Sequence, residues 1–119
     1  MQYVGVDMVE ISRIGEAIAA RGEVFLSRIY TPAELANYRH KLPSLAVRFS
    51  AKEAAIKALG SKGLSLKEIE ILSAVDGKPA LILHGKARRR ADELGLDTLD
   101  VSLSHTRDYA VACVVGFVP

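Results

Sequence analysis

The sequence predicts an α+β fold in which a small, mainly antiparallel sheet packs against one long central helix. The helix is predicted over 44–59, where nearly every residue is a good helix former and where Pro43 and Gly60 mark the two ends. In the second half of the chain, apolar residues alternate with polar ones, which is typical of strands. An apolar run at 109–115 indicates that one strand lies in the centre of the sheet.

Composition and charge are those of an ordinary globular domain. Of the 119 residues, 50% are hydrophobic and 25% are charged, which is enough for one domain with a core. The net charge of +2 is too small to indicate nucleic-acid binding, and no apolar run is long enough to span a membrane. Cys113, the only cysteine, is expected to be a buried thiol. We expect a cytoplasmic protein that binds neither nucleic acid nor membrane.

The first predicted element is a strand over 3–9. Gly5 and Asp7 point to one face of it, opposite to the apolar side chains. Asp is disfavoured in strands, and the glycine leaves the space beside it empty. This combination suits a carboxylate that faces a crowded ligand, but an Asp near a strand end also caps a following helix. The residues alone leave both interpretations open.

Three helices are predicted before the central one. Residues 10–20 have the amphipathic pattern of a surface helix, and 24–29 form a short helical piece. The third helix, 31–38, begins with a Thr-Pro-x-Glu pattern that is typical of a helix start. Scattered basic residues are typical of a solvated surface or of a docking face for an acidic protein. In this half of the chain they include Arg13, Arg21 and Arg28.

The central helix carries a stripe of residues suited to binding. Glu53, Lys57 and Gly60 follow one another at helical spacing, just before a Gly-Ser-Lys-Gly turn at 60–63. A carboxylate binds a hard cation and a lysine binds a phosphate, so the stripe suits a phosphate ligand with a metal ion. A Glu followed four residues later by a Lys is also an ordinary surface ion pair.

A hairpin and a helix are predicted after this turn. The hairpin has strands over 69–72 and 79–84, joined by a tight turn of the Asp-Gly type at 75–78. The helix covers 85–94 and contains three consecutive arginines, at 88–90. Because consecutive helix residues point in different directions, we interpret these arginines as a solvated face.

The last two strands form a second hairpin. The strand over 99–105 alternates cleanly, and the apolar run 109–115 follows after a short turn. His105 and Thr106 lie at the tip between them. These residue types are common in turns, and side by side they also donate hydrogen bonds to an anion.

Three segments together resemble the motifs of the 4′-phosphopantetheinyl transferases. They are Val-Gly-Val-Asp at 4–7, Arg-Phe-Ser-Ala-Lys-Glu-Ala-Ala-Ile-Lys at 48–57 and Ser-Leu-Ser-His-Thr at 102–106, in that order. The short length and the Lys-Ala-Leu-Gly continuation at 57–60 are similar to the holo-[acyl-carrier-protein] synthase branch. The resemblance covers essentially the whole chain, so we expect 1–119 to be a single phosphopantetheinyl transferase domain with the fold of that family.

The resemblance implies roles for individual residues. Asp7 and Glu53 match the magnesium ligands of the family, and Lys57 matches the lysine at the phosphates. The turn at 60–63 departs from the commoner small-residue glycine loop by carrying a lysine. The resemblance and this turn together give a set of expected coenzyme A contacts: Arg48, Lys52, Lys57, Gly60, Lys62, Gly63, His105 and Thr106.

The resemblance also implies an activity. Members transfer 4′-phosphopantetheine from coenzyme A to a serine of apo acyl carrier protein in fatty acid biosynthesis, with release of adenosine 3′,5′-bisphosphate. A homotrimer with active sites at subunit interfaces is implied as well. Glu53 is the first candidate for the general base and Asp7 the second. We expect the acidic carrier protein to dock on the arginines at 13, 21 and 28.

Two other functions are weighed against this one. A non-catalytic module that binds coenzyme A or a nucleotide would keep the basic residues and glycines but would not need both Asp7 and Glu53. A small nucleic-acid-binding domain would need an aromatic-rich sheet or a concentrated basic face. Four tyrosines, three phenylalanines and no tryptophan give little support for that.

Overall fold

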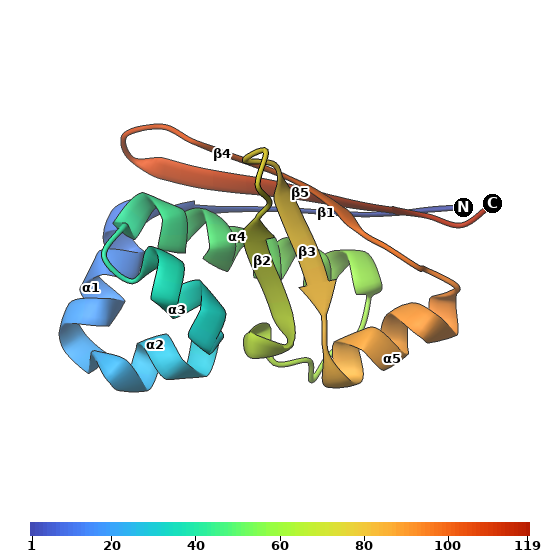
Figure 1. The fold of residues 1–119 in the computed structure, drawn as a ribbon, viewed down its shortest axis with the longest axis horizontal. Helices are drawn as coiled ribbons and strands as arrows, with labels where there is room; N and C mark the ends of the chain where they lie inside the picture. The colour runs from blue at the N-terminus through green and yellow to red at the C-terminus, as the bar shows by residue number, and fades with distance from the viewer.

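Helix α4 (Leu42–Leu59) lies at the centre of the molecule, between a three-stranded sheet and a two-stranded hairpin (Figure 1). The computed structural model describes all of residues 1–119. Helices α1 to α3 gather at one end of α4, and α5 lies near the other end (Figure 1). The remaining elements, in chain order, are β1 (Gln2–Glu10), α1 (Ile11–Arg21), α2 (Glu23–Ile29), α3 (Pro32–Tyr38), a 3-10 turn η1 (Leu66–Glu68), β2 (Ile69–Ser73), β3 (Pro79–Leu83), α5 (Gly85–Leu94), β4 (Asp100–His105) and β5 (Tyr109–Phe117).

The larger sheet is antiparallel, with strand order β1-β5-β4. Its centre is β5, as the apolar run 109–115 predicts. The hairpin β2-β3 forms a separate two-stranded sheet, so the predicted α+β class is confirmed with two small sheets in place of one. Residues 74–78 join the hairpin strands and contain the predicted Asp-Gly turn, in which Gly77 has a φ of 85°.

A close contact between β1 and α4 fixes the position of the first motif. A side chain at Gly5 would place its Cβ only 1.9 Å from the carbonyl oxygen of Ala54. Only glycine therefore allows β1 to lie this close to the helix. The sequence interpretation attributed the missing side chain at Gly5 to a ligand that lies beside Asp7. In the structure, helix α4 occupies the space next to Gly5. The alternative of Asp7 as a cap is excluded, because Glu10 is the N-cap residue of α1.

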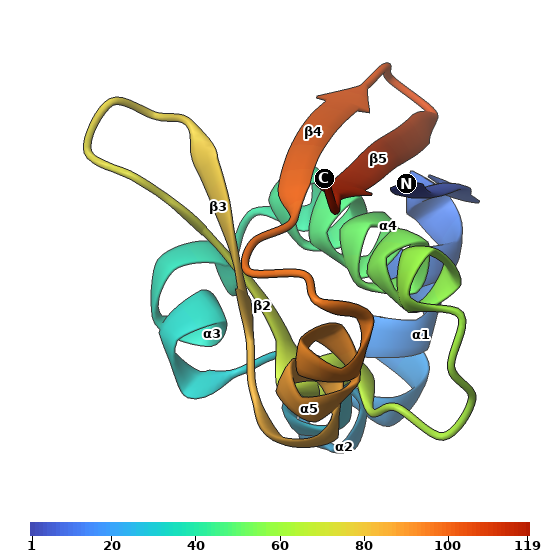
Figure 2. The same ribbon diagram turned by 90° about the vertical axis from the view of Figure 1, so that its right-hand side faces the viewer.

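The two faces of the larger sheet differ. One face packs on α4, and no helix covers the other (Figure 2). On β1, Val4, Val6 and Met8 remain 56%, 55% and 64% exposed on this uncovered side. In the sheet register they lie beside half-buried residues of β5. We call this surface the outer face, and it consists of Val4, Val6, Met8, Val111, Cys113 and Val115. Cys113 is thus half-buried on the outer face, where the sequence predicted a fully buried thiol.

Side chains fix the ends of the shorter helices. Thr31 and Glu34 form the predicted capping box at the start of α3. Glu68 accepts hydrogen bonds from the backbone N–H groups of Lys86 and Ala87, and so caps α5 from outside the helix. None of the helices combines the length and the apolar character needed to cross a lipid bilayer.

Candidate functional site

The structure brings Asp7, Glu53 and Lys57 together where β1 crosses α4. Lys57 Nζ lies 3.1 Å from Asp7 Oδ1 and donates a second hydrogen bond, of 3.0 Å, to the carbonyl oxygen of Val6. The Asp7 side chain is 19% exposed and the Lys57 side chain 57%, so this pair lies at the edge of the protein. The ion pair joins the first motif to the second. Lys57 therefore pairs with a residue from another element, and Glu53 is not its ion-pair partner.

A pocket of about 340 Å³ lies beside these carboxylates. Asp7 and Glu53 line it together with Arg13 and Arg21 of α1. The guanidinium of Arg21 lies 5.0 Å from the ring centre of Phe25, in a cation–π contact. Apolar residues complete the lining: Met8, Val9, Ile14, Ala17, Phe25 and Phe49. The pocket thus presents two carboxylates, two guanidinium groups and an apolar floor.

The pocket environment changes the ionisation of Glu53. Partial burial and the neighbouring carboxylate of Asp7 raise the pKa of Glu53 above its ordinary value, and the ammonium of Lys57 opposes this rise. A carboxylate with a raised pKa is a better proton acceptor near neutral pH than an ordinary glutamate. The site therefore contains a carboxylate suited to act as a general base.

The donor set also fits a magnesium ion. Magnesium is held in proteins by one or two carboxylates together with water and substrate phosphates. Asp7 and Glu53 lie close enough to repel each other electrostatically, and a cation between them would relieve this repulsion. No group of three or more His, Cys, Asp or Glu residues is placed so that it could hold a metal ion.

The glycine-rich turn follows directly after Lys57. Gly60 ends α4 in the left-handed conformation with a φ of 61°, and Gly63 has a φ of 82°. Lys62 is exposed between them. The turn therefore leaves backbone and one free amine on the surface, about one helical turn beyond Lys57.

His105 and Thr106 lie elsewhere on the same chain. Both are exposed at the tip of the β4-β5 hairpin, where Thr106 Oγ1 accepts hydrogen bonds from the backbone N–H groups of Asp108 and Tyr109. Neither residue lines the pocket beside Asp7. Because β5 separates β1 from β4, two strand spacings, roughly 10 Å, lie between these edges of the sheet.

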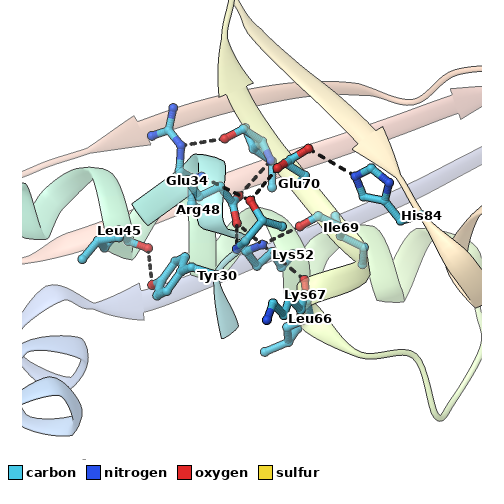
Figure 3. A network of polar contacts seen from close by, with 12 residues as sticks. Tyr30, Glu34, Leu45, Arg48, Lys52, Leu66, Lys67, Ile69, Glu70 and His84 are labelled. Carbon is cyan, nitrogen blue, oxygen red and sulfur yellow. Dashed lines mark hydrogen bonds and ion pairs between the residues drawn. The ribbon is translucent and has the colours of Figure 1, made fainter. Parts of the chain in front are cut away.

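Lys52 is not in the pocket. Its side chain is fully buried, and its ammonium donates to Glu34 Oε1 at 2.7 Å and to the carbonyl oxygens of Leu66 and Ile69 (Figure 3). Burial lowers the pKa of Lys52, and the charge of Glu34 opposes this. With three acceptors, the ammonium has no donor left for a phosphate. The expectation that Lys52 contacts coenzyme A is therefore corrected: in this structure it binds the interior.

Arg48 is also buried. Its Nε donates to the carbonyl oxygen of Ile71 at 2.9 Å, and its Nη2 donates to Ser73 Oγ at 3.2 Å. Its guanidinium lies 3.5 Å from the ring centre of Tyr38. The side chain joins α4 to β2 and α3, so the expected contact of Arg48 with coenzyme A is corrected in the same way.

Sequence reasoning missed the residues that complete this buried network. Glu34 was interpreted only as the third residue of a capping box, a signal that does not reveal its other partners. Its carboxylate also accepts from Lys52 and from the backbone N–H of Ile71. Arg28 is exposed on α2 but does not line the pocket that Arg13 and Arg21 share.

Comparisons with known proteins identify the family of the chain. The model of the 4′-phosphopantetheinyl transferase superfamily matches residues 3–114. A holo-[acyl-carrier-protein] synthase of Dehalococcoides mccartyi is 53% identical over 117 residues, which is 98% of each chain. The crystal structure of the Neisseria meningitidis synthase has a TM-score of 0.87 at 32% identity and covers 98% of both chains. That of the Helicobacter pylori synthase in complex with coenzyme A has a TM-score of 0.86 at 32% identity, over 96% of this chain and 99% of that one. The chain therefore belongs to the 4′-phosphopantetheinyl transferase superfamily, in its holo-[acyl-carrier-protein] synthase branch, and is an enzyme of that family.

Proposed function

We propose that this enzyme transfers 4′-phosphopantetheine from coenzyme A to a serine of apo acyl carrier protein, in a magnesium-dependent reaction. The observation that carries the proposal is the meeting of Asp7, Glu53 and Lys57 beside one pocket in a chain of this family. A module that only binds coenzyme A would not need two carboxylates at this place. We further propose that residues 1–119 act as one domain, in the cytoplasm and in fatty acid biosynthesis, as the motif resemblance implies.

Each group of the site has a chemical task. The carrier serine oxygen attacks the phosphorus that bears pantetheine, and the bond from this phosphorus to the bridging oxygen breaks to release adenosine 3′,5′-bisphosphate. Asp7 and Glu53 would hold the magnesium ion, which neutralises charge on the phosphate oxygens. Lys57, already held beside Asp7, supplies a positive charge to the pyrophosphate. Glu53, directly or through a metal-bound water, would accept the serine proton.

Coenzyme A binding is assigned to exposed residues. Lys57, the turn with Gly60, Lys62 and Gly63, and the hairpin tip with His105 and Thr106 are all accessible. We leave Arg48 and Lys52 out of the binding site, because their side chains are occupied by partners in the interior.

We propose that the enzyme is a homotrimer whose sites lie between subunits. Three exposed apolar side chains of β1 on the outer face support a self-contact, because such patches mark interaction sites. Strand β1 is an edge of the sheet, so a copy that covers the outer face at β1 would also approach the pocket beside Asp7. The separation of His105 and Thr106 from Asp7 within one chain also supports a site completed by a neighbour.

The carrier protein is proposed to dock on α1. Arg13 and Arg21 line the same pocket as the two carboxylates, so a negatively charged partner bound there would bring its serine close to Glu53. Arg28 on α2 is proposed to extend this basic surface, with weaker support because it does not line the pocket.

One assay tests the proposed function. The protein is incubated with coenzyme A, magnesium and an apo acyl carrier protein, and the intact carrier is weighed by mass spectrometry. We expect the carrier mass to rise by one phosphopantetheine group, and the rise to disappear with a chelator or in Asp7→Asn. A carrier of unchanged mass beside coenzyme A bound to the enzyme would instead support the non-catalytic binding module.

A further inference from the structure

A buried ion pair lies on the side of α4 that faces α3 and β2. Glu34 and Lys52 have side chains that are 0% exposed, and their charged atoms are 2.7 Å apart (Figure 3). The Glu34 carboxylate also accepts from the backbone N–H groups of Thr31 at 2.9 Å and Ile71 at 2.9 Å. The pair therefore joins α3, α4 and β2 through one carboxylate.

Every hydrogen-bonding group of this pair is used. The three N–H bonds of the Lys52 ammonium go to Glu34 and to the carbonyl oxygens of Leu66 and Ile69. No buried side-chain nitrogen or oxygen in the protein lacks a partner. A fully satisfied polar cluster holds its members in one arrangement, because any other arrangement leaves a buried charge without a partner.

Stability alone does not explain this pair. Removing two charges from water is costly, and replacing a buried ion pair by apolar side chains of similar volume is often neutral or stabilising. What such a pair adds is a fixed geometry. Here the geometry is the rotation and height of α4 relative to α3 and the β2-β3 hairpin.

The geometry of α4 determines the active site. Glu53 follows Lys52 directly in α4, while Asp7 reaches the pocket from β1. On the other side of α4, the backbone of β1 lies against Ala54. The contact at Gly5 is already so close that β1 cannot move further toward the helix. A rotation of α4 about its axis would therefore change the separation between the Glu53 and Asp7 carboxylates.

We propose that Glu34 and Lys52 are positioning residues, which lock the rotation of α4 and thereby set the distance between the Asp7 and Glu53 carboxylates. This proposal rests on the proposed function of those carboxylates as metal ligands. The two neighbouring residues Lys52 and Glu53 then have different roles. The lysine holds the helix in place from the interior, and the glutamate faces the pocket.

The test uses the double variant Glu34→Gln/Lys52→Met, which removes both charges at nearly constant volume. Lys52→Met alone would leave the Glu34 carboxylate buried without its cation, so loss of folding is expected there. Ile71→Val is the matched control, because it removes a buried methylene group beside the pair and leaves every polar contact in place. Asp7→Asn serves as the reference for a lost metal ligand.

Three quantities are measured: the unfolding midpoint, the affinity for Mn²⁺ by electron paramagnetic resonance, and kcat and KM for coenzyme A. We expect the double variant to unfold at or above the wild-type temperature. Its kcat should fall by about 10- to 100-fold, since small misplacements of catalytic groups have effects of this size. Its Mn²⁺ affinity should fall as well, while its KM for coenzyme A changes little. Glu34→Asp, which keeps both charges and draws the carboxylate back by one methylene group, should show the same order of effects, only weaker.

Wild-type kcat and wild-type Mn²⁺ affinity in a folded double variant would overturn the proposal. So would an equal loss of kcat in Ile71→Val, because any weakening of the core would then suffice. If the double variant does not fold, Glu34→Asp, in which both charges remain, decides by the same two criteria. Should the wild-type enzyme transfer nothing, the proposed function fails, whereas the Mn²⁺ affinities still test the positioning of Asp7 and Glu53.

Discussion

At the scale of single residues, the site is an electrostatic balance among Asp7, Glu53 and Lys57. The ammonium of Lys57 bonds to Asp7, and this leaves Glu53 as the carboxylate with the raised pKa. The Asp7 carboxylate thus has an ion-pair partner within the protein, and the Glu53 carboxylate is the better proton acceptor near neutral pH. Binding of a cation would shift this balance, because its charge favours the ionised form of both groups.

The balance predicts opposite effects of two substitutions on the pKa of Glu53 in the metal-free enzyme. Asp7→Asn removes a negative neighbour and should lower the pKa of Glu53 toward its ordinary value. Lys57→Met removes the positive neighbour and should raise it further. Carboxyl ¹³C NMR of the titrating enzyme measures both shifts. Shifts of the same sign in the two variants would contradict the assignment of these neighbours.

The raised pKa also predicts the pH dependence of stability. Because the folded pKa of Glu53 lies above the unfolded value, its protonated form contributes stability at low pH, and this contribution is lost as pH rises through the folded pKa. Glu53→Gln should therefore abolish transfer without lowering the unfolding midpoint near neutral pH. Thermal unfolding of the wild-type and variant proteins side by side checks this. A clearly lower midpoint for Glu53→Gln would contradict the claim that the ionised Glu53 side chain destabilises the fold.

The sequence located the residues of the pocket better than those of the interior. Asp7, Glu53 and Lys57 followed from residue type and helical spacing, and the structure places them together. Lys52 and Arg48 belong to the same motif, but a motif does not show which side of the helix faces a ligand. Their acceptors are backbone carbonyls and Glu34, which lie in other elements and have no signal near 48–52.

At the scale of elements, the contact between β1 and α4 positions the catalytic groups. The strand lies against a helix face made of Ala51, Ala54 and Ala58, and Gly5 meets it without a side chain. Small residues on both sides bring the two backbones close together. Asp7, two residues after the glycine, is thereby held at the height of Glu53.

Gly5→Ala should consequently be destabilising. Its Cβ would lie 1.9 Å from a backbone oxygen, so β1 must move away from α4. We expect a loss of about 1–3 kcal/mol, typical of overpacking in a core. Gly116→Ala is the comparison, because the nearest atoms to its Cβ would belong to the side chains of Leu99 and Leu96, at 2.6 and 2.8 Å, and not to the backbone. Urea unfolding gives both values, and equal losses would show that the backbone contact is not decisive.

The proposed docking of the carrier protein on α1 leads to a kinetic prediction. Reversal of charge in Arg13→Glu should raise the KM for the carrier, leave the KM for coenzyme A nearly unchanged and flatten the salt dependence of the rate. Arg89→Glu makes the same change of charge at an exposed position of α5 that does not line the pocket, and it serves as a control. Steady-state kinetics at several salt concentrations test this, and unchanged carrier kinetics in Arg13→Glu would place the docking surface elsewhere.

Helices and strands with a clear hydrophobic period or a capping motif could be predicted from the sequence. The packing of these elements against one another could not. The helix over 85–94 coincides with α5, and 31–38 has the expected cap. The period of two in 3–9 separated the two faces of β1, yet it could not show that the apolar face remains uncovered. That depends on which elements reach the sheet, and α4 and the hairpin β2-β3 both lie on the opposite side.

At the scale of the whole molecule, the outer face is a surface on which apolar side chains stay exposed in the single chain. Val6→Glu places a charge at the centre of it, on a side chain that is already 55% exposed, so the subunit fold should survive. We expect a change from trimer to monomer in light scattering, together with loss of transfer. Val24→Glu, at a valine that is 63% exposed on α2, should remain trimeric. A wild-type protein that is already monomeric would refute the proposed assembly.

The central claim is that transfer takes place where the carboxylates of one copy meet the hairpin tip of another. The most direct measurement mixes two inactive variants, Asp7→Ala and His105→Ala/Thr106→Ala, after dissociation and reassembly. If each site uses Asp7 from one copy and the tip from its neighbour, random pairing restores about one quarter of the wild-type rate. A mixture as inactive as its two components would contradict the claim, because both halves of the site would then come from the same chain.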